Sequence, residues 1–135
     1  MSHQLPAISL AGLNPIPLDP MADHKRLIVW VAAKDLAVEV YRLVGVSAIA
    51  RDYGLRNQLL RAAVSVPSNI AEGYARETSA DRKHFLTIAL GSCAELETQL
   101  LIASEVGLIA SASAQALIAK VNEVSKMLFS LRRKL

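Results

Sequence analysis

Apolar side chains recur every three or four residues along most of this 135-residue chain, which is the spacing of one face of an α-helix. The pattern predicts four helices, the first over residues 22–43 and the second from Tyr53 to a break at residues 77–79. The third runs from this break to Gly107, and the fourth carries its apolar stripe over residues 117–135. Four amphipathic helices joined by short connections predict an all-α fold, an antiparallel up-down four-helix bundle.

The segment before the first helix and the start of the third carry further signals. Residues 1–21 hold four of the five prolines, which predicts an extended or disordered arm ahead of a bundle over residues 22–135. Asp19 followed by Pro20 has the form of a helix N-cap with proline at the first helical position. A Thr-Ser pair at residues 78–79 supplies a candidate N-cap for the third helix.

The second predicted helix contains a proline and a glycine within its apolar segment, residues 64–74. Both residue types destabilise a helix interior, so their presence indicates a requirement for a local backbone shape or for close packing. Pro67 is expected to kink the helix, because its ring removes a hydrogen-bond donor and collides with the preceding turn. Gly73 is expected to permit the close approach of another element.

The third predicted helix is apolar on more than one face. A helix of this kind is either central in its domain or faces another subunit. Hydrophobic residues make up 53% of the chain, more than a small helical protein needs for one core, so we expect a homo-oligomer. The apolar residues of this helix outside its stripe are Phe85, Ile88, Leu90, Leu101 and Ile102.

The cysteine count and the lengths of the apolar segments exclude several classes of protein. Cys93 is the only cysteine, which excludes an intrachain disulfide and a cysteine-rich zinc site. The first residues lack the basic and apolar regions of a secretory signal. No stretch approaches the ~18 consecutive apolar residues of a transmembrane helix. We therefore expect a cytoplasmic protein with no membrane partner.

Three motifs carry a family resemblance: RAAVSVPSNIAEG at residues 61–73, YGL at residues 53–55 and AELETQL at residues 94–100. Through them, and over residues 27–135, the chain resembles a bacterial four-helix-bundle family. Its members include proteins encoded in intervening sequences of large-subunit ribosomal RNA genes, often labelled ribosomal-protein-like. The accessory variability proteins of diversity-generating retroelements are similar.

The resemblance implies a bundle that assembles as a homopentameric ring. In the retroelement branch, a basic surface of such a ring engages nucleic acid and the reverse transcriptase. The implied partners are therefore further copies of the chain, and nucleic acid or a nucleic-acid-processing protein. Most other members have no established activity.

This chain departs from the family pattern at two positions. Glu77 lies in a turn that is often rich in Lys and Arg, and Leu90 stands where a basic residue is common. Both departures lower the expected positive field.

The basic residues are the first candidate functional set. The formal net charge of +3 and the sequence pI of about 9.2 show a mild basic excess. Cations can bind a phosphate backbone, whereas base-specific readout is not expected, because aromatic side chains that stack on bases make up only 4% of the chain. The candidate nucleic-acid-binding residues are Arg51, Arg56, Arg61, Arg132, Arg133 and Lys134.

A second candidate set is polar and lies on the second and third predicted helices. Glu72 and Arg76 are four residues apart and can pair on one helical face. The set has two interpretations: a site for a phosphate or polar ligand, or a structural polar network that fixes helix register, and the second is favoured. Its members are Arg61, Asn69, Glu72, Arg76, Glu95 and Gln99.

Catalytic and metal chemistry find little support. Cys93 lies on an apolar stripe, and no Ser/His/Asp order or glycine-rich phosphate loop is visible, so no catalytic residue is expected. A di-iron bundle uses Glu-x-x-His pairs, and Asp81 with His84 is the only approximation to such a pair in the sequence. We therefore expect neither a metal site nor a cofactor.

The leading hypothesis is a non-enzymatic oligomeric scaffold or adaptor that binds a protein partner or a nucleic-acid backbone. The alternative is a small-ligand- or metal-binding bundle that uses Glu72 and Glu95.

Overall fold

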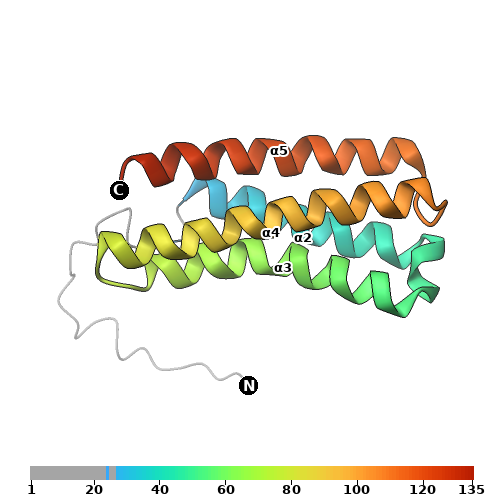
Figure 1. The fold of residues 1–135 in the computed structure, drawn as a ribbon, viewed down its shortest axis with the longest axis horizontal. Helices are drawn as coiled ribbons and strands as arrows, with labels where there is room; N and C mark the ends of the chain where they lie inside the picture. The colour runs from blue at the N-terminus through green and yellow to red at the C-terminus, as the bar shows by residue number, and fades with distance from the viewer. Residues whose placement is uncertain (1–23, 25–26) are drawn as a thin grey trace, which may run out of the picture.

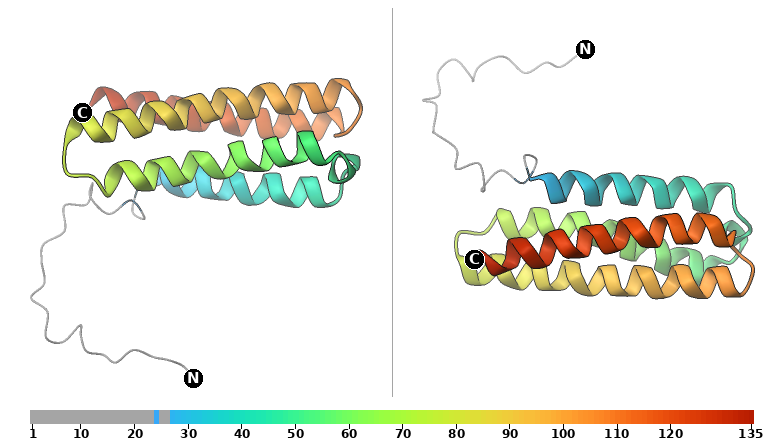
Figure 2. Two further views of the ribbon diagram at one scale, coloured as in Figure 1. Left: turned by 60° about the horizontal axis from the view of Figure 1, so that its bottom comes forward. Right: turned by 90° about the horizontal axis from the view of Figure 1, so that it is seen from above.

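The computed structural model describes His24 and residues 27–135, and these form an all-α bundle of four helices (Figure 1). Successive helices run in opposite directions and pack against each other, and the last helix closes the bundle against the first. Two further views show the same arrangement (Figure 2). The predicted all-α four-helix fold is confirmed. The elements are α2 (Ile28–Gly45), the 3₁₀ turn η2 (Ala48–Arg51), α3 (Tyr53–Tyr74), α4 (Ser79–Glu105) and α5 (Ser111–Arg133).

The first helix begins later than its apolar pattern predicts. The prediction of residue 22 is wrong, because Leu27 is extended, with φ −75° and ψ 126°, and α2 starts at the next residue. The Leu27 side chain is nevertheless buried, so it extends the apolar pattern without being helical. The predicted cap at Asp19 and Pro20, and the predicted arm over residues 1–21, lie outside the described residues.

Side-chain caps and a glycine define the ends of the middle helices. The Asp52 carboxylate accepts a hydrogen bond from the Leu55 N–H at 3.1 Å, which starts α3. Thr78 does the same for α4 through the Asp81 N–H, also at 3.1 Å, so the predicted cap is confirmed. After α4 the chain turns at Gly107, whose φ of +80° favours glycine.

The predicted apolar stripes form the core. The residues in the middle of each stripe are buried, and those near the ends of the bundle, such as Leu55 and Leu131, are half-buried. η2, which the apolar pattern did not predict, adds a fully buried Ile49 that closes one end. Buried stripe residues include Ala33, Leu36, Val40, Leu59, Val66, Ile70, Leu86, Leu96, Leu100, Val121, Val124 and Leu128.

α4 remains apolar on its outer side as well. Ile88, Leu101 and Ile102 are exposed, while Phe85 and Leu90 are half-buried. By length and composition this helix could cross a membrane, but its buried face packs against α3 and α5, as expected of the core helix of a bundle. The outer side of α4 thus exposes three large apolar side chains along its length.

The α3–α4 pair packs more extensively than any other helix pair among the described residues, and Gly73 lies where α3 comes close to the α4 backbone. A Cβ added at Gly73 would lie 3.0 Å from the Phe85 Cβ and 3.4 Å from the Arg82 carbonyl oxygen. The predicted role of Gly73 in close packing is confirmed. α3 continues through a buried Pro67, and the kink expected there stays a prediction.

A small hydroxyl cluster joins α3 and α4 beside Pro67, with its α3 members two residues before and two residues after the proline. The Ser65 and Ser92 hydroxyl oxygens lie 2.7 Å apart and share a hydrogen bond. The Asn69 side-chain amide donates to the Ser65 hydroxyl at 2.9 Å and to the Ser65 carbonyl at 2.8 Å. Because Ser92 is buried, its hydroxyl depends on this contact.

The Gly73→Ala substitution tests the close approach of α3 and α4. The added methyl group meets atoms that are fixed to the α4 backbone, and overpacking of this kind costs about 1–3 kcal/mol. This cost exceeds the ~1 kcal/mol that alanine gains over glycine within a helix. We expect urea denaturation at a fixed protein concentration to show a free energy of unfolding that is lower by about 1 kcal/mol.

Gly91→Ala is the matched control, because an added Cβ at Gly91 has no atom within 4 Å. This variant should be more stable than the wild type by up to ~1 kcal/mol. Equal stabilisation by the two substitutions would contradict the close approach at Gly73.

A double-mutant cycle tests the hydroxyl cluster. Ser65→Ala leaves the buried Ser92 hydroxyl without a partner and should lower the free energy of unfolding by about 1–3 kcal/mol. Once Ser92→Ala is present, the same change should cost less, with a coupling energy of about 0.5–1.5 kcal/mol. Urea denaturation of the two single variants and the double variant measures this coupling. Additive effects would show that the contact contributes nothing to stability.

Candidate functional site

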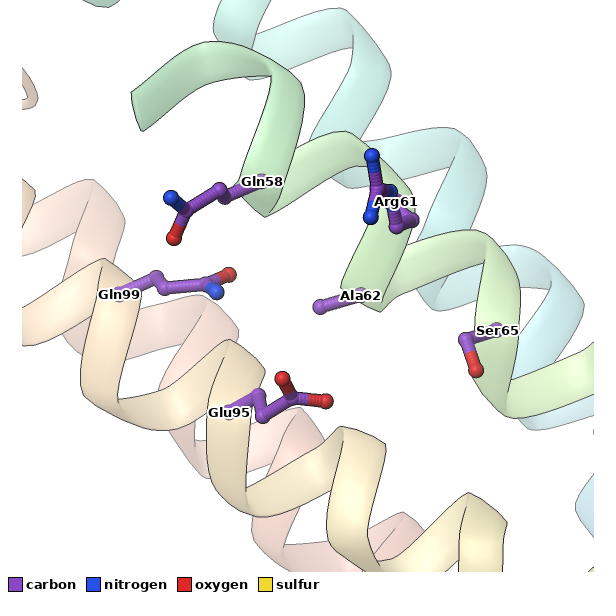
Figure 3. A pocket seen from close by; sticks show the side chains of 6 residues that line it. All are labelled: Gln58, Arg61, Ala62, Ser65, Glu95 and Gln99. Atoms are coloured by element: carbon purple, nitrogen blue, oxygen red, sulfur yellow. The ribbon is translucent and has the colours of Figure 1, made fainter. Parts of the chain in front are cut away.

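A polar cleft of about 310 Å³ lies between α3 and α4. Glu95 and Gln99 reach into it from α4, and Gln58 reaches toward them from α3 (Figure 3). The buried Ala62 supplies an apolar floor. The cleft adjoins the hydroxyl cluster, because Ser65 belongs to both. Its lining residues are Gln58, Arg61, Ala62, Ser65, Glu95 and Gln99.

The polar groups of the cleft are incompletely paired. Arg61 and Glu95 lie on facing helices, yet no ion pair joins them in the described part of the chain. The Gln99 Oε1 atom is buried and has no hydrogen-bond partner among the described residues. Such an acceptor carries an uncompensated desolvation cost. The cleft therefore presents one cation and one anion, and an unpaired acceptor is buried in its wall.

The six residues predicted as one polar network fall into three groups. Arg61, Glu95 and Gln99 line the cleft. Asn69 instead donates to Ser65 in the hydroxyl cluster, which contains none of the other five predicted residues. The remaining two form an exposed pair: the Arg76 Nη2 lies 2.8 Å from the Glu72 Oε2, and the Arg76 guanidinium also lies over the Phe85 ring, 5.0 Å from its centroid.

Sequence reasoning missed two parts of this region. Gln58 lines the cleft, and Ser65 with Ser92 makes the contact between the helices. A signal existed for Ser92, because it precedes Cys93 on the buried stripe of α4. A buried hydroxyl at such a position needs a partner, but a carbonyl of its own helix can provide it as well as a polar group on a neighbouring helix, so the sequence alone does not identify Ser65.

The candidate nucleic-acid-binding residues separate to opposite ends of the bundle. Arg51 and Arg56 lie where η2 meets α3, and Arg56 donates to the Ala50 carbonyl at 3.1 Å. Arg61 lies in the polar cleft instead. The other three candidates close α5 at the far end, beside the start of α4 (Figures 1 and 2). In one subunit the six cations therefore do not form a single surface.

Cations from α4 and α5 meet at the end of the bundle where α5 finishes. The Arg132 Nη1 donates to the Thr87 hydroxyl at 3.1 Å, and Lys83 lies one turn before Thr87 on α4. Residues 72–83 and 130–135 contain six basic and three acidic side chains, an excess that equals the net charge of the whole chain. We call this surface the cationic end and define it by Arg82, Lys83, Arg132, Arg133 and Lys134.

The helix dipoles of α4 and α5 explain the positions of only some cations in the cationic end. Arg132 and Arg133 stand in the last turn of α5, where the dipole favours cations. Arg82 and Lys83 stand near the N-terminus of α4, where the dipole favours anions. The Arg82 guanidinium packs over the Tyr74 ring, 5.1 Å from its centroid, so Lys83 is the α4 cation that neither the dipole nor this packing explains.

An apolar groove of about 370 Å³ lies on another side of the bundle, between α2 and α3. Val38, Tyr41 and Val64 are 39%, 51% and 40% exposed there. Exposed apolar side chains gathered in this way are typical of a protein–protein contact. The groove is lined by Lys34, Ala37, Val38, Tyr41, Arg42, Val64 and Pro67.

Thiol chemistry is disfavoured by the position of Cys93. Burial raises the pKa of the Cys93 thiol, and a hydrogen bond with Ser125 opposes this only in part. A raised thiol pKa lowers the fraction of the reactive thiolate. In the part of the chain that the structure describes, no three His, Cys, Asp or Glu side chains gather as a metal site would require.

Comparisons with known proteins agree with the fold. The model of the 23S rRNA-intervening sequence protein family matches residues 25–130. The chain is also similar to a solved structure from Bacteroides thetaiotaomicron, a protein of unknown function from the S23 ribosomal protein family. The TM-score is 0.72 at 23% identity, over 78% of this chain and 98% of that one, and a likeness at this identity shows the fold alone. No match was found among curated proteins.

The family match carries more weight than the structural one, because it spans more than half of the chain and includes all of α2, α3 and α4. It also includes the segment around Pro67 and Gly73, where α3 approaches α4. The chain belongs to the 23S rRNA-intervening sequence protein family.

Proposed function

We propose that this protein is a non-enzymatic, homo-oligomeric scaffold that binds the phosphate backbone of nucleic acid through its cationic end. The observation that carries the proposal is the Arg132–Thr87 contact, which brings the α5 cations to the Lys83 turn of α4, while the chain outside residues 72–83 and 130–135 is formally neutral. The family's description names a ribosomal RNA intervening sequence, so RNA is the first nucleic acid to test.

The side chains of the cationic end suit backbone contacts. No ion pair engages Lys83, Arg132 or Arg133 among the described residues, so their charges are available to phosphates. The Arg132 guanidinium also lies 5.1 Å from the ring centroid of Phe129, which is 48% exposed. An exposed ring beside cations can stack on a base of any sequence. Such a surface favours affinity without base-specific readout.

Assembly would multiply these contacts. The apolar groove between α2 and α3 and the exposed apolar side of α4 give each subunit two surfaces that another copy can bury. In a closed ring, such as the homopentamer that the family resemblance implies, every subunit contributes one cationic end. Phosphate contacts would then add together, and binding would depend steeply on salt.

The alternative site on Glu72 and Glu95 has less support. Glu72 is paired with Arg76 and is not among the residues that line the cleft with Glu95. No observation favours a ligand or metal shared by these two carboxylates.

Light scattering on the full chain tests the assembly. We expect a mass about five times the 14.6 kDa of one chain, because the family resemblance implies a ring of five subunits and a closed ring buries the apolar groove in every one of them. The groove variant Val38→Glu should lower this mass, since it places a charge in the contact. Glu123→Gln, on the exposed side of α5, should leave it unchanged. A monomeric mass for the wild type would contradict the proposal.

Fluorescence anisotropy with a labelled RNA oligonucleotide tests the cationic end. The variant Arg132→Gln/Arg133→Gln/Lys134→Gln should bind at least about tenfold more weakly than the wild type at ~50 mM salt. For a single-stranded oligonucleotide, the magnitude of the slope of log affinity against log salt should fall by about 0.7 for each phosphate contact removed.

The control variant Arg51→Gln/Lys120→Gln/Lys126→Gln loses the same formal charge at residues outside both the cationic end and the apolar groove. It should bind RNA nearly as well as the wild type. Two results would overturn the proposal: no binding by the wild type even at low salt, or an equal loss of affinity in both triple variants.

A further inference from the structure

We propose that the polar cleft between α3 and α4 binds a small zwitterion with one carboxylate and one ammonium group, the chemistry of a free α-amino acid. The cleft lies away from the cationic end, so this inference is independent of nucleic-acid binding. It rests on the opposite charges that line the cleft, on one unpaired hydrogen-bond acceptor and on the volume of the cleft.

The charges are arranged for a ligand that carries both signs. Arg61 on α3 and Glu95 on α4 line the same cleft from opposite sides (Figure 3). The Arg61 guanidinium can bind a carboxylate in bidentate fashion, and the Glu95 carboxylate can accept from an ammonium group. A direct pair between two exposed side chains contributes little to stability, so the two residues lose little by binding a ligand instead of each other.

The side-chain amide of Gln99 favours a ligand that can donate a hydrogen bond. The Gln99 Oε1 is buried without a partner, and Figure 3 shows its side chain extending into the cleft beside Glu95. An ammonium group held by Glu95 has three N–H donors, and a turn of the Gln99 side chain toward the cleft would let its Oε1 accept one of them. Gln58, opposite Gln99, offers a further donor and acceptor. Ser65 is already engaged by Ser92 and Asn69, which fixes the adjoining wall.

The size of the cleft limits the ligand. Its volume of about 310 Å³ lies at the lower end of the range found for ligand pockets, which suits a molecule of amino-acid size. The floor at Ala62 is apolar and can contact only a short aliphatic portion. Anions without an ammonium group would leave Glu95 and Gln99 unmatched, and amines without a carboxylate would leave Arg61 unmatched.

Nuclear magnetic resonance on the isotopically labelled full chain tests the inference. Each standard L-amino acid is titrated to ~10 mM, a range that detects millimolar affinity. At least one should shift amide resonances at residues 58–65 and 95–99. Its N-acetyl derivative, which lacks the ammonium group, and its C-terminal amide, which lacks the carboxylate, should each bind at least about tenfold more weakly.

Variants of the two charged residues provide the second part of the test. Arg61→Met and Glu95→Gln should each weaken binding at least about tenfold. Arg133→Met and Glu97→Gln are matched controls outside the cleft and should bind the amino acid as the wild type does. Circular dichroism on all four establishes that each retains its helices.

Three outcomes would overturn the inference. They are no response to any amino acid, equal binding of the derivatives that lack one charge, and unchanged affinity in the cleft variants. The triple variant of Arg132, Arg133 and Lys134 should retain amino-acid binding, so a failure of RNA binding and a failure of this site remain distinguishable.

Discussion

The contact between α3 and α4 is the constraint on which the rest of the structure depends. At Gly73 the two helices approach so closely that a single methyl group would meet the Phe85 Cβ at 3.0 Å. Two turns earlier, Ser65 and Ser92 share a hydrogen bond across the same contact, and Asn69 holds the Ser65 hydroxyl in place. The bundle is thus a tight helical hairpin onto which α2 and α5 pack.

Both candidate sites follow from this hairpin. The cleft opens beside the hydroxyl cluster, where longer polar side chains such as Arg61 and Glu95 replace small ones along the α3–α4 contact. The turn after α3 brings the start of α4 to the end of the bundle where α5 finishes, and Lys83 thereby comes near Arg132. The same packing thus creates a mixed-charge cleft on one side and a cationic surface at one end.

The apolar period predicted the helices and most of the core, because burial of one helical face follows directly from residue spacing. It also indicated close packing at Gly73, since glycine in a helix needs such a reason. It placed the start of α2 too early, because Leu27 is buried although its backbone is extended. The Ser65–Ser92 pair and the nearness of Lys83 to Arg132 escaped prediction, because they depend on which helices are neighbours and in what register.

Native-state hydrogen exchange measures the central role of the α3–α4 hairpin most directly. If this contact organises the bundle, the amides of Val66, Ile70 and Leu96 should exchange only through global unfolding and should be the slowest in the chain. Amides in α2 and α5 should exchange at a lower free energy, through partial opening that leaves the hairpin intact. Slower exchange of core amides in α2 or α5 than of those three would contradict the account.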